Sequence, residues 1–454
     1  MRNQLRNRTA PRRPRAGPRP PSGRSLVSEP DRGRGSGKKP LLLLCCLLAA
    51  GLGWWLCHPQ KAAEDTPLTS SLAEQPEPDG PAWRNLSALL AGRLDELPGA
   101  ACLEIPVAGG AVLSLRTGLD PEVQQRVEEG LSRSQAVGAG AAVLDPRSGR
   151  ILALACYNRD PARPMVFFWK SYPAASLIKV VTAAAAIETG RLEPCSILTY
   201  TGGPYSLRPR DLGPETRRWS ARVTLQNAFA RSLNTVLGRI GIYETGPSML
   251  REFGTRFFFN RPLPCEVPFE SSFFPVPEDR FGIAQAASGY NQRTLITTLH
   301  AAWIAALVAA GGASPTPWLV ERVEGEPEAG GPSLHRPGAP IRVLSTAAAN
   351  KMQQLMEATI TEGTCRRSFA PRHRSALLRT LRFGGKTGNI NNEEDTLKYD
   401  WFMGYAKDAA GIPSVALSVF VLHDRQLGHR ANRVAFDLFQ GYFQNRETAP
   451  SSRP

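Results

Sequence analysis

The chain has 454 residues, a formal net charge of +15 at neutral pH, and a 42% hydrophobic content. Its length suits one large domain or two ordinary ones. The charge is concentrated at the N-terminus, where residues 1–39 contain 12 lysines and arginines but only two acidic residues. Because the remainder is only weakly basic, the composition argues against nucleic-acid binding by the folded part.

The first 57 residues are predicted to form a tail and a membrane anchor. Residues 1–39 are rich in Pro, Arg and Gly without apolar periodicity, so we expect a disordered cytoplasmic tail. An uncharged run of 17 residues follows, from Leu41 to Cys57, which is near the lower limit for a membrane-spanning helix. Positive charges before the run predict a cytoplasmic N-terminus, and residues 40–57 are assigned to a single transmembrane helix. A cleaved signal peptide is the alternative.

Beyond the anchor, the chain is predicted to be exported and mostly folded. Residues 58–84 carry Pro and Glu but few large apolar side chains, and are assigned to a flexible linker. Residues 85–109 are assigned to a small N-terminal subdomain with a short helix and a Gly-rich turn. Residues 110–446 are assigned to one continuous domain, and residues 447–454 to a disordered C-terminus.

The folded part begins with a predicted helix and a strand pair. Residues 120–134 are amphipathic, with Asp120 suited to the N-cap and Pro121 to the first helical position. Residues 140–157 predict two strands joined by a turn from Asp145 to Gly149.

Helices dominate the middle of the domain and strands its end. Helices are predicted at 174–189, 223–241, 294–310 and 345–362. Strands are predicted at 381–390, 399–406 and 413–424, followed by a closing helix at 433–443. Strands that flank a helical middle indicate an α+β domain, in which an antiparallel sheet carries a helical subdomain.

Cysteine and histidine do not indicate a metal or redox site. Neither the eight cysteines nor the six histidines have the spacing of metal ligands. We therefore expect no metal and no cofactor. One or two disulfides are allowed in an oxidising compartment. His300 lies in an apolar segment and is predicted to be a core histidine.

One predicted helix places a lysine in an apolar environment. The segment 174–189 is apolar on nearly every face, yet Ser176 and Lys179 lie on the same side of its first turn. Burial of an unpaired lysine is costly unless the amine loses its proton. Because its burial is costly, Lys179 is expected to have a functional role.

Three short motifs follow one another along the chain: Ser176-Leu-Ile-Lys179, Ser232-Leu-Asn234 and Lys386-Thr-Gly388. The first is weak alone, because Ser36-Gly-Lys-Lys39 in the predicted tail has the same spacing. The K-T-G triplet is expected only about 0.1 times by chance in a chain of this length. Together the three are the signature of active-site serine enzymes that act on penicillin and on D-alanyl-D-alanine peptides.

The chain resembles the transpeptidase domain of penicillin-binding proteins over residues 110–445. Beyond the motifs, the resemblance rests on further segments: Gly140–Leu154, Ala287–Tyr290 with Leu295–Ala302 and Gly311–Gly312, Glu362–Cys365 and Asp400–Ala406. It implies the family's α+β fold, in a monofunctional, membrane-anchored form without a glycosyltransferase domain.

The resemblance also implies a role for each residue of the first two motifs. Ser176 would be the nucleophile, at a helix N-terminus. Lys179 would be the base, kept neutral by its apolar surroundings and by the charge of Lys386. Ser232 would relay a proton to the leaving amine, and Asn234 would hold both the substrate amide and Lys179.

The third motif would bind the substrate. Lys386 and Thr387 would bind its terminal carboxylate, and Gly388 would let the peptide lie against the strand. The backbone N–H groups of Ser176 and Asn389 would form the oxyanion hole. The family commonly has Thr or Ser where this chain has Asn389, a departure that leaves the backbone donor in place.

These roles predict a serine D,D-transpeptidase that cross-links peptidoglycan stem peptides through an acyl-enzyme on Ser176. Its expected partners are stem peptides ending in D-Ala-D-Ala, covalently bound β-lactams and other cell-wall synthesis proteins, with no nucleic acid. The catalytic domain would lie outside the cytoplasm, anchored to the cell membrane by one span. A D,D-carboxypeptidase or β-lactamase would share the acylation step. A non-catalytic β-lactam sensor or cell-wall scaffold is an alternative of a different class.

Overall fold

The computed structural model describes residues 81–448, apart from the gaps 107–111, 163–165, 215–217, 326–332, 335–337, 425 and 427. The predicted tail, the predicted transmembrane helix at 40–57 and most of the predicted linker lie outside the described residues. In the part of the chain that is described, no helix is long and apolar enough to cross a membrane.

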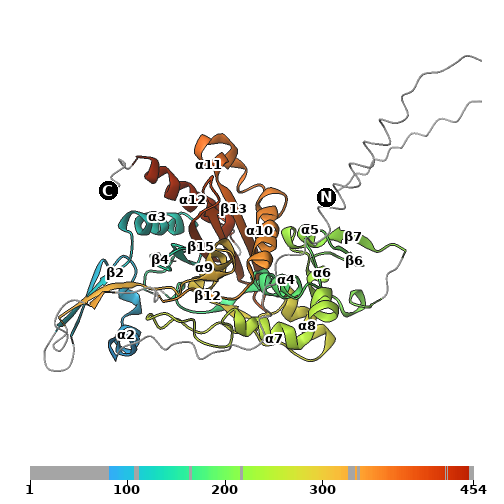
Figure 1. The fold of residues 1–454 in the computed structure, drawn as a ribbon, viewed down its shortest axis with the longest axis horizontal. Helices are drawn as coiled ribbons and strands as arrows, with labels where there is room; N and C mark the ends of the chain where they lie inside the picture. The colour runs from blue at the N-terminus through green and yellow to red at the C-terminus, as the bar shows by residue number, and fades with distance from the viewer. Residues whose placement is uncertain are drawn as a thin grey trace, which may run out of the picture. The chain divides into compact units, whose positions relative to one another are not determined.

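A five-stranded antiparallel sheet forms the centre of the fold, in the order β13-β14-β15-β3-β4 (Figure 1). Its strands are β3 (Gly138–Leu144), β4 (Ile151–Asn158), β13 (Arg382–Asn391), β14 (Lys398–Lys407) and β15 (Pro413–His423). The N-terminal strand pair joins the C-terminal strands because β3 pairs antiparallel with β15. The predicted antiparallel sheet is thereby confirmed, with β13 at its edge.

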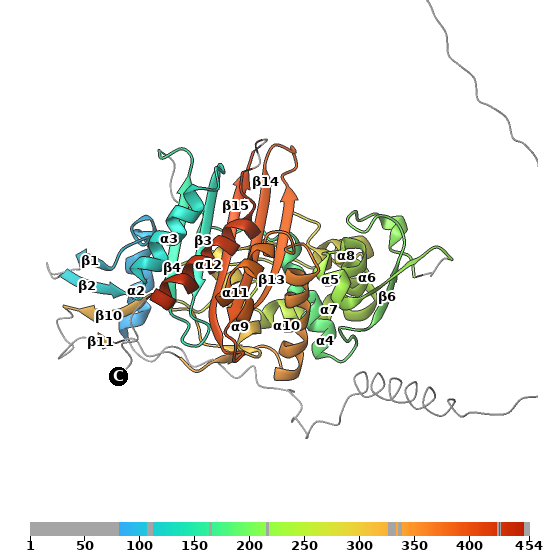
Figure 2. The same ribbon diagram turned by 90° about the horizontal axis from the view of Figure 1, so that it is seen from above.

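Helices cover both faces of this sheet (Figure 2). One face packs against α3 (Pro121–Ser132) and α12 (Ala431–Thr448). The other packs against α9 (Thr298–Ala309), in which every residue is buried. A helix that is apolar on all sides needs such complete enclosure.

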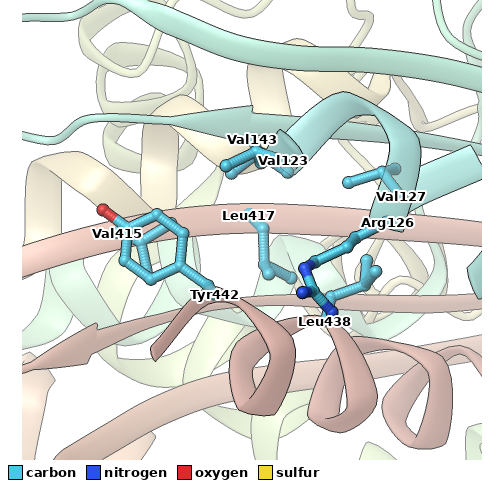
Figure 3. Close-up of a pocket in the computed structure, with 8 residues that line it drawn as sticks. All are labelled: Val123, Arg126, Val127, Val143, Val415, Leu417, Leu438 and Tyr442. Carbon is cyan, nitrogen blue, oxygen red and sulfur yellow. The ribbon is translucent and has the colours of Figure 1, made fainter. Parts of the chain in front are cut away.

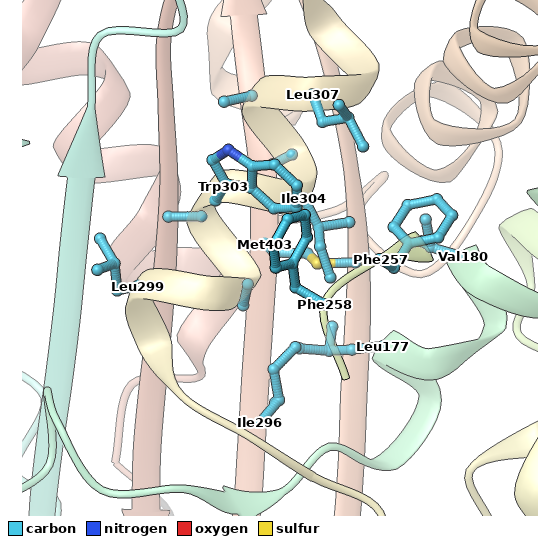
Figure 4. Close-up of a cluster of buried hydrophobic side chains, with 14 of the residues drawn as sticks. Leu177, Val180, Phe257, Phe258, Ile296, Leu299, Trp303, Ile304, Leu307 and Met403 are labelled. Atoms are coloured by element: carbon cyan, nitrogen blue, oxygen red, sulfur yellow. The ribbon is translucent and has the colours of Figure 1, made fainter. Parts of the chain in front are cut away.

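The core around α9 reaches the segment that carries the predicted nucleophile. Figure 4 shows Trp303 of α9 next to Phe258 and Met403. The rings of Trp303 and Phe258 meet edge to face, with centroids 5.3 Å apart. Leu177 and Val180, which flank Lys179, belong to the same buried cluster. Packing of the core therefore sets the position of the first motif.

A cluster of helices lies beside β13 (Figure 1). Its members are α4 (Lys179–Glu188), α5 (Leu225–Ala230), α6 (Asn234–Ile240), α7 (Gly246–Arg256), α8 (Arg280–Ser288) and α10 (Thr346–Thr361). The short elements are β5 (Tyr172–Pro173), the 3₁₀ turn η2 (Ala175–Ile178), β6 (Ile197–Tyr200), η3 (Pro209–Asp211), β7 (Ala221–Thr224), the π-helical η4 (Gly241–Thr245), β8 (Leu295–Ile296), β9 (Ala313–Ser314), β12 (Ile341–Arg342), η5 (Ala370–Arg374) and α11 (Ala376–Thr380). This cluster is the helical subdomain that the sequence predicts.

A second sheet lies at the N-terminal side, in the order β1-β2-β10-β11. Its strands are β1 (Cys102–Pro106), β2 (Val112–Thr117), β10 (Val320–Glu324) and β11 (Ser333–Leu334), and α2 (Pro81–Ala91) and η1 (Leu94–Glu96) precede them. Helix α2 begins inside the predicted linker, and the β1–β2 pairing spans the boundary predicted at residue 109. Since β10 comes from much later in the chain, sequence proximity alone does not reveal this sheet.

Two segments predicted as continuous helices are interrupted at their functional serines. The helix predicted from residue 174 is a 3₁₀ turn followed by α4, and the one predicted at 223–241 is split into β7, α5 and α6. Ala175 and Ser232 have φ angles of +47° and +60°. A left-handed residue cannot continue a right-handed helix, so the first predicted helix becomes regular only after Ala175, and the prediction of a continuous helix was wrong at Ser232.

His300 is a core residue, as predicted. Its ring nitrogens lie 2.7 Å from Ser272 Oγ and 2.6 Å from the Phe257 carbonyl oxygen. Burial lowers the pKa of His300 to about 4, so the ring is neutral at physiological pH. Cys156 and Cys365 are also buried, which raises each thiol pKa to about 12 and keeps the thiols protonated.

Candidate active site

The turn that carries Ser176 is held by a close contact with the end of α8. Ser176 is partly exposed, whereas its neighbours Ala175 and Leu177 are buried. Gly289 follows α8 with a φ of +68°, and a Cβ there would collide with the Ala175 carbonyl oxygen. Only glycine satisfies both the left-handed backbone and the close approach. Gly289 therefore supports the left-handed turn that presents the serine hydroxyl.

Lys179 connects the first two motifs. Its Nζ lies 2.5 Å from Ser176 Oγ and 2.6 Å from Asn234 Oδ1. The side chain is fully buried. Burial, and secondarily the charge of Lys386, lowers the pKa of Lys179 well below its ordinary value of 10.5. A neutral amine at this position has a lone pair with which to accept the Ser176 proton.

The backbone around Tyr205 orients Asn234, the first residue of α6. The Asn234 backbone N–H donates to the Pro204 carbonyl at 2.8 Å, and its Nδ2 donates to the Tyr205 carbonyl at 2.5 Å. With Nδ2 so engaged, Oδ1 faces Lys179. The amide therefore accepts from the lysine and cannot compete with it as a donor to Ser176.

Lys386 of β13 is a buried cation in contact with the second motif. Its Nζ donates to Ser232 Oγ at 2.9 Å and to the Thr387 carbonyl at 2.8 Å, and it lies 5.6 Å from the centroid of the Phe229 ring. Burial lowers the pKa of Lys386 to about 7. No ion pair to Lys386 is found within the described part of the chain. An incoming carboxylate would supply the missing counter-charge.

The rest of the third motif lies against the nucleophile turn. A Cβ at Gly388 would lie 2.9 Å from the Ala174 carbonyl oxygen and 3.2 Å from the Ser176 backbone nitrogen. Glycine at 388 therefore allows β13 to approach the Ser176 backbone closely. Asn389 follows with an exposed side chain. The two segments expected to supply the oxyanion-hole N–H groups are thus adjacent.

The structure adds Thr364, to which the sequence analysis gave no role. Thr364 Oγ1 lies 2.7 Å from Thr387 Oγ1, and its backbone N–H donates to the Ala230 carbonyl at 3.1 Å. Thr364 therefore joins β13 to the end of α5, just before Ser232. The only sequence signal was its place in a segment that resembles the family. Tyr205 gave no signal at all, because it acts through its backbone carbonyl.

Two pockets among the described residues are lined by none of the motif residues, and the larger, of about 310 Å³, lies beside β6, α6 and η4. A cavity of about 10 Å³, large enough for about one water, lies between α3 and α12 (Figure 3). It is lined by Val123, Arg126, Val127, Val143, Val415, Leu417, Leu438 and Tyr442. Within the described ranges, no group of three or more His, Cys, Asp or Glu side chains could hold a metal ion.

The chain is similar in sequence to known proteins. The family model for the penicillin binding protein transpeptidase domain matches residues 139–440. Peptidoglycan D,D-transpeptidase PbpA of Mycobacterium tuberculosis (strain ATCC 25618 / H37Rv) is 28% identical over 343 residues, which cover 67% of this chain and 66% of that protein. Stage V sporulation protein D of Bacillus subtilis (strain 168) is 23% identical over 299 residues, or 62% of this chain and 45% of that protein.

Solved structures show the same fold. The crystal structure of PBPA from Mycobacterium tuberculosis matches with a TM-score of 0.59 and 23% identity, over 73% of this chain and 80% of that one. The structure of an imipenem acyl-enzyme complex of penicillin-binding protein A from the same organism matches with a TM-score of 0.58 and 23% identity, over 73% and 79% of the two chains.

Proposed function

The chain belongs to the penicillin-binding protein transpeptidase family, and we propose that it is a serine D,D-transpeptidase that cross-links peptidoglycan stem peptides. The observation that carries the proposal is that two buried lysines each form hydrogen bonds to motif residues. Lys179 contacts Ser176 and Asn234, while Lys386 contacts Ser232 and lacks an acidic partner among the described residues. This arrangement supplies a nucleophile, a base and a carboxylate-binding cation within one site.

Acylation would begin when neutral Lys179 accepts the Ser176 proton. Oγ then attacks the carbonyl carbon of the penultimate D-alanine of the donor peptide. The backbone N–H groups of Ser176 and Asn389 would stabilise the negative oxygen of the tetrahedral intermediate. Ser232 would pass a proton to the departing D-alanine amine, as the C–N bond breaks and the ester forms.

The third motif would hold the donor in place. Lys386 and Thr387 would bind the terminal carboxylate, and Gly388 would let the peptide lie along β13. In the second half-reaction, an amine from a neighbouring stem peptide would attack the ester and release Ser176. A β-lactam would acylate the same oxygen. The acyl-enzyme structures of the mycobacterial protein support this last step for a protein of the same fold.

We also propose that this domain works outside the cytoplasm on a single membrane anchor. The support is the uncharged run at 41–57 and the positive charge before it, together with relatives named as peptidoglycan enzymes. In this arrangement, residues 1–39 would be a cytoplasmic tail. Residues 58–80 would link the anchor to the folded part, which begins with α2 and in which β1 and β2 pair across the predicted boundary at residue 109.

The direct test identifies the acylated residue and then the acceptor. After incubation with penicillin, peptide mass spectrometry should place the adduct on Ser176. With a D-Ala-D-Ala pentapeptide donor and an amine acceptor, the transpeptidase should form the amide-linked product with loss of D-alanine. Release of tetrapeptide alone would identify a carboxypeptidase, and rapid penicillin turnover a β-lactamase. Absence of both an adduct and penicillin turnover would contradict all three and favour a non-catalytic scaffold.

The second-order rate constant for acylation by penicillin should depend on pH in a bell shape. The lowered pKa of Lys179 makes the base available at neutral pH, so the rate should fall in acid as the base becomes protonated. Since the pKa of Lys386 is about 7, the cation that binds the penicillin carboxylate is lost above that pH. The acid and alkaline limbs of the profile report apparent pKa values that belong to the two lysines as a coupled pair.

Lys386→Gln identifies the alkaline limb of this profile. Acylation by this variant should be slower than by the wild type, and its rate should no longer decline above about pH 7. The acid limb should move to higher pH, because the Lys386 charge that helps to lower the pKa of Lys179 is gone. Stopped-flow rates with a chromogenic β-lactam measure all three. A wild-type rate that climbs without a maximum to pH 9 would be inconsistent with this role for Lys386.

A further inference from the structure

The segment between α10 and β13 carries a local excess of positive charge. We term residues 362–382 the arginine-rich connector. It contains one acidic residue, Glu362, and six arginines: Arg366, Arg367, Arg372, Arg374, Arg379 and Arg382. The rest of the chain from residue 81 onward is nearly balanced, with 36 lysines and arginines against 32 acidic residues. The excess therefore belongs to this connector and not to the domain as a whole.

Most of these arginines are exposed and have no acidic partner among the residues that the structure describes. Arg366, Arg367, Arg374 and Arg379 are exposed, and none of them forms an ion pair with a described residue. Arg382 is the exception, paired with Glu357 at 2.8 Å. Four guanidinium groups are thus free to meet an anionic ligand.

The connector is ordered because its apolar residues are anchored in the core. Phe369 and Leu378 are buried, and the Phe369 ring contacts the rings of Phe402 and Phe436 at centroid distances of 5.7 and 5.2 Å. The connector also contains two short helical elements, η5 and α11, the second of which is labelled in Figure 1. A surface that is already ordered loses less conformational entropy when a ligand binds.

The connector begins at the candidate active site. Thr364, near its start, contacts Thr387 of the third motif and the Ala230 carbonyl. Arg366 lies two residues beyond Thr364, and exposed Arg231 directly follows Ala230. From there the arginines continue to the start of β13, about 13 Å from Lys386 at the rise of an extended strand. The arginine-rich connector therefore begins in contact with the third motif and ends four residues before Lys386.

We propose that the arginine-rich connector binds the carboxylates of assembled peptidoglycan, so that the substrate is a polymer strand rather than an isolated peptide. This proposal rests on the proposed transpeptidase function. Each stem peptide with a free C-terminus carries a negative charge, and a strand presents many of them in a row. Guanidinium groups match carboxylates in shape and charge and can bind them in a bidentate manner. The connector holds the strand while Lys386 holds the terminus of one peptide.

The test compares two triple variants of the full chain in detergent. R366S/R367S/R374S removes three connector charges, and R116S/R133S/R147S removes three exposed arginines that already have acidic neighbours elsewhere. Co-sedimentation with insoluble peptidoglycan, stripped of attached phosphate polymers, measures binding. The connector variant should bind about tenfold more weakly, as expected for three exposed charge pairs, and the control variant like the wild type. R366K/R367K/R374K should retain most of the binding, since the charge is kept.

The chemistry of the ligand is tested separately. Binding of the wild type should be strongly reduced in 0.5 M NaCl and with peptidoglycan whose carboxylates have been converted to amides. Equal sedimentation of the wild type and the connector variant, or binding indifferent to amidation, would overturn the proposal. Binding to polyphosphate or anionic vesicles but not to stripped peptidoglycan would also overturn it.

Unchanged thermal unfolding of the connector variant would show that its fold is intact. Penicillin labelling of the wild type separates this proposal from the proposed function. A wild type that is not labelled contradicts the enzyme assignment, whereas a labelled wild type without connector-dependent binding contradicts only the polymer proposal.

Discussion

Replacement of Ser176 by alanine is expected to abolish covalent labelling by fluorescent penicillin. The Ser176 oxygen is the atom that would form the ester, and no other hydroxyl contacts the buried amine of Lys179 in the described residues. The loss should exceed about 1,000-fold, as for other enzymes that lose their nucleophile. Fluorescence on a denaturing gel and intact-protein mass measure it. Thermal unfolding should change little, because the Ser176 side chain is partly exposed.

Ser36→Ala is the matched control, because Ser36 and Lys39 have the same spacing as Ser176 and Lys179. Ser36 lies outside the domain that the family model matches, and its replacement should leave labelling unchanged. Undiminished labelling of the Ser176→Ala variant would show that another residue is the nucleophile. Ser232 would then be the first candidate, since its hydroxyl accepts from Lys386.

Lys179→Met is expected to separate catalysis from stability. Loss of the base should slow acylation about 10²- to 10⁴-fold, as measured by stopped flow with a chromogenic β-lactam. The variant should also be more stable than the wild type, because methionine fills similar space without a buried amine. In the wild type the lowered pKa of Lys179 costs stability wherever the unfolded chain is protonated, that is, below its ordinary value of 10.5. The gain in stability should therefore grow as the pH falls and vanish above 10.5.

Lys407→Met makes the same chemical change in another buried lysine. Lys407 lies on β14, 7% exposed, and its Nζ donates to Gln353 Oε1 at 2.7 Å. Burial lowers the pKa of Lys407 as well, but it contacts none of the three motifs. Acylation by this variant should match the wild type. Wild-type acylation by the Lys179→Met variant would remove Lys179 from the mechanism.

The sequence was sufficient to predict the C-terminal strands of the sheet. The strands at 381–390, 399–406 and 413–424 have apolar patterns and turns that depend on neighbouring residues, so local reasoning located them. It also placed Lys386, Thr387 and Gly388 on one strand that lies at the sheet edge. The composition of β10 gives no comparable sign that it pairs with β2, because such a pairing depends on distant parts of the chain.

The sequence could not predict the interruptions at Ala175 and Ser232. Neither alanine nor serine favours a positive φ, and the surrounding residues favour helix. At Ala175, the left-handed turn is accompanied by a contact from Gly289, which packs on the Ala175 carbonyl. At Ser232, it is accompanied by the hydrogen bond from Lys386. Tertiary contacts thus overrode local propensity at both predicted catalytic serines.

By itself, the sequence determined which chemical groups the candidate site contains, because a nucleophile, two amines and an amide are properties of residue type. Only the tertiary structure decided that Lys179 meets Asn234 at 2.6 Å and that Lys386 meets Ser232 at 2.9 Å, although these pairs are 55 and 154 positions apart in the sequence. The apolar segment around Lys179 already indicated that this amine is buried, whereas the burial of Lys386, which lowers its pKa to about 7, appears only in the structure. The distances between motifs depend on packing between segments remote in the chain, and no local pattern of residues records them.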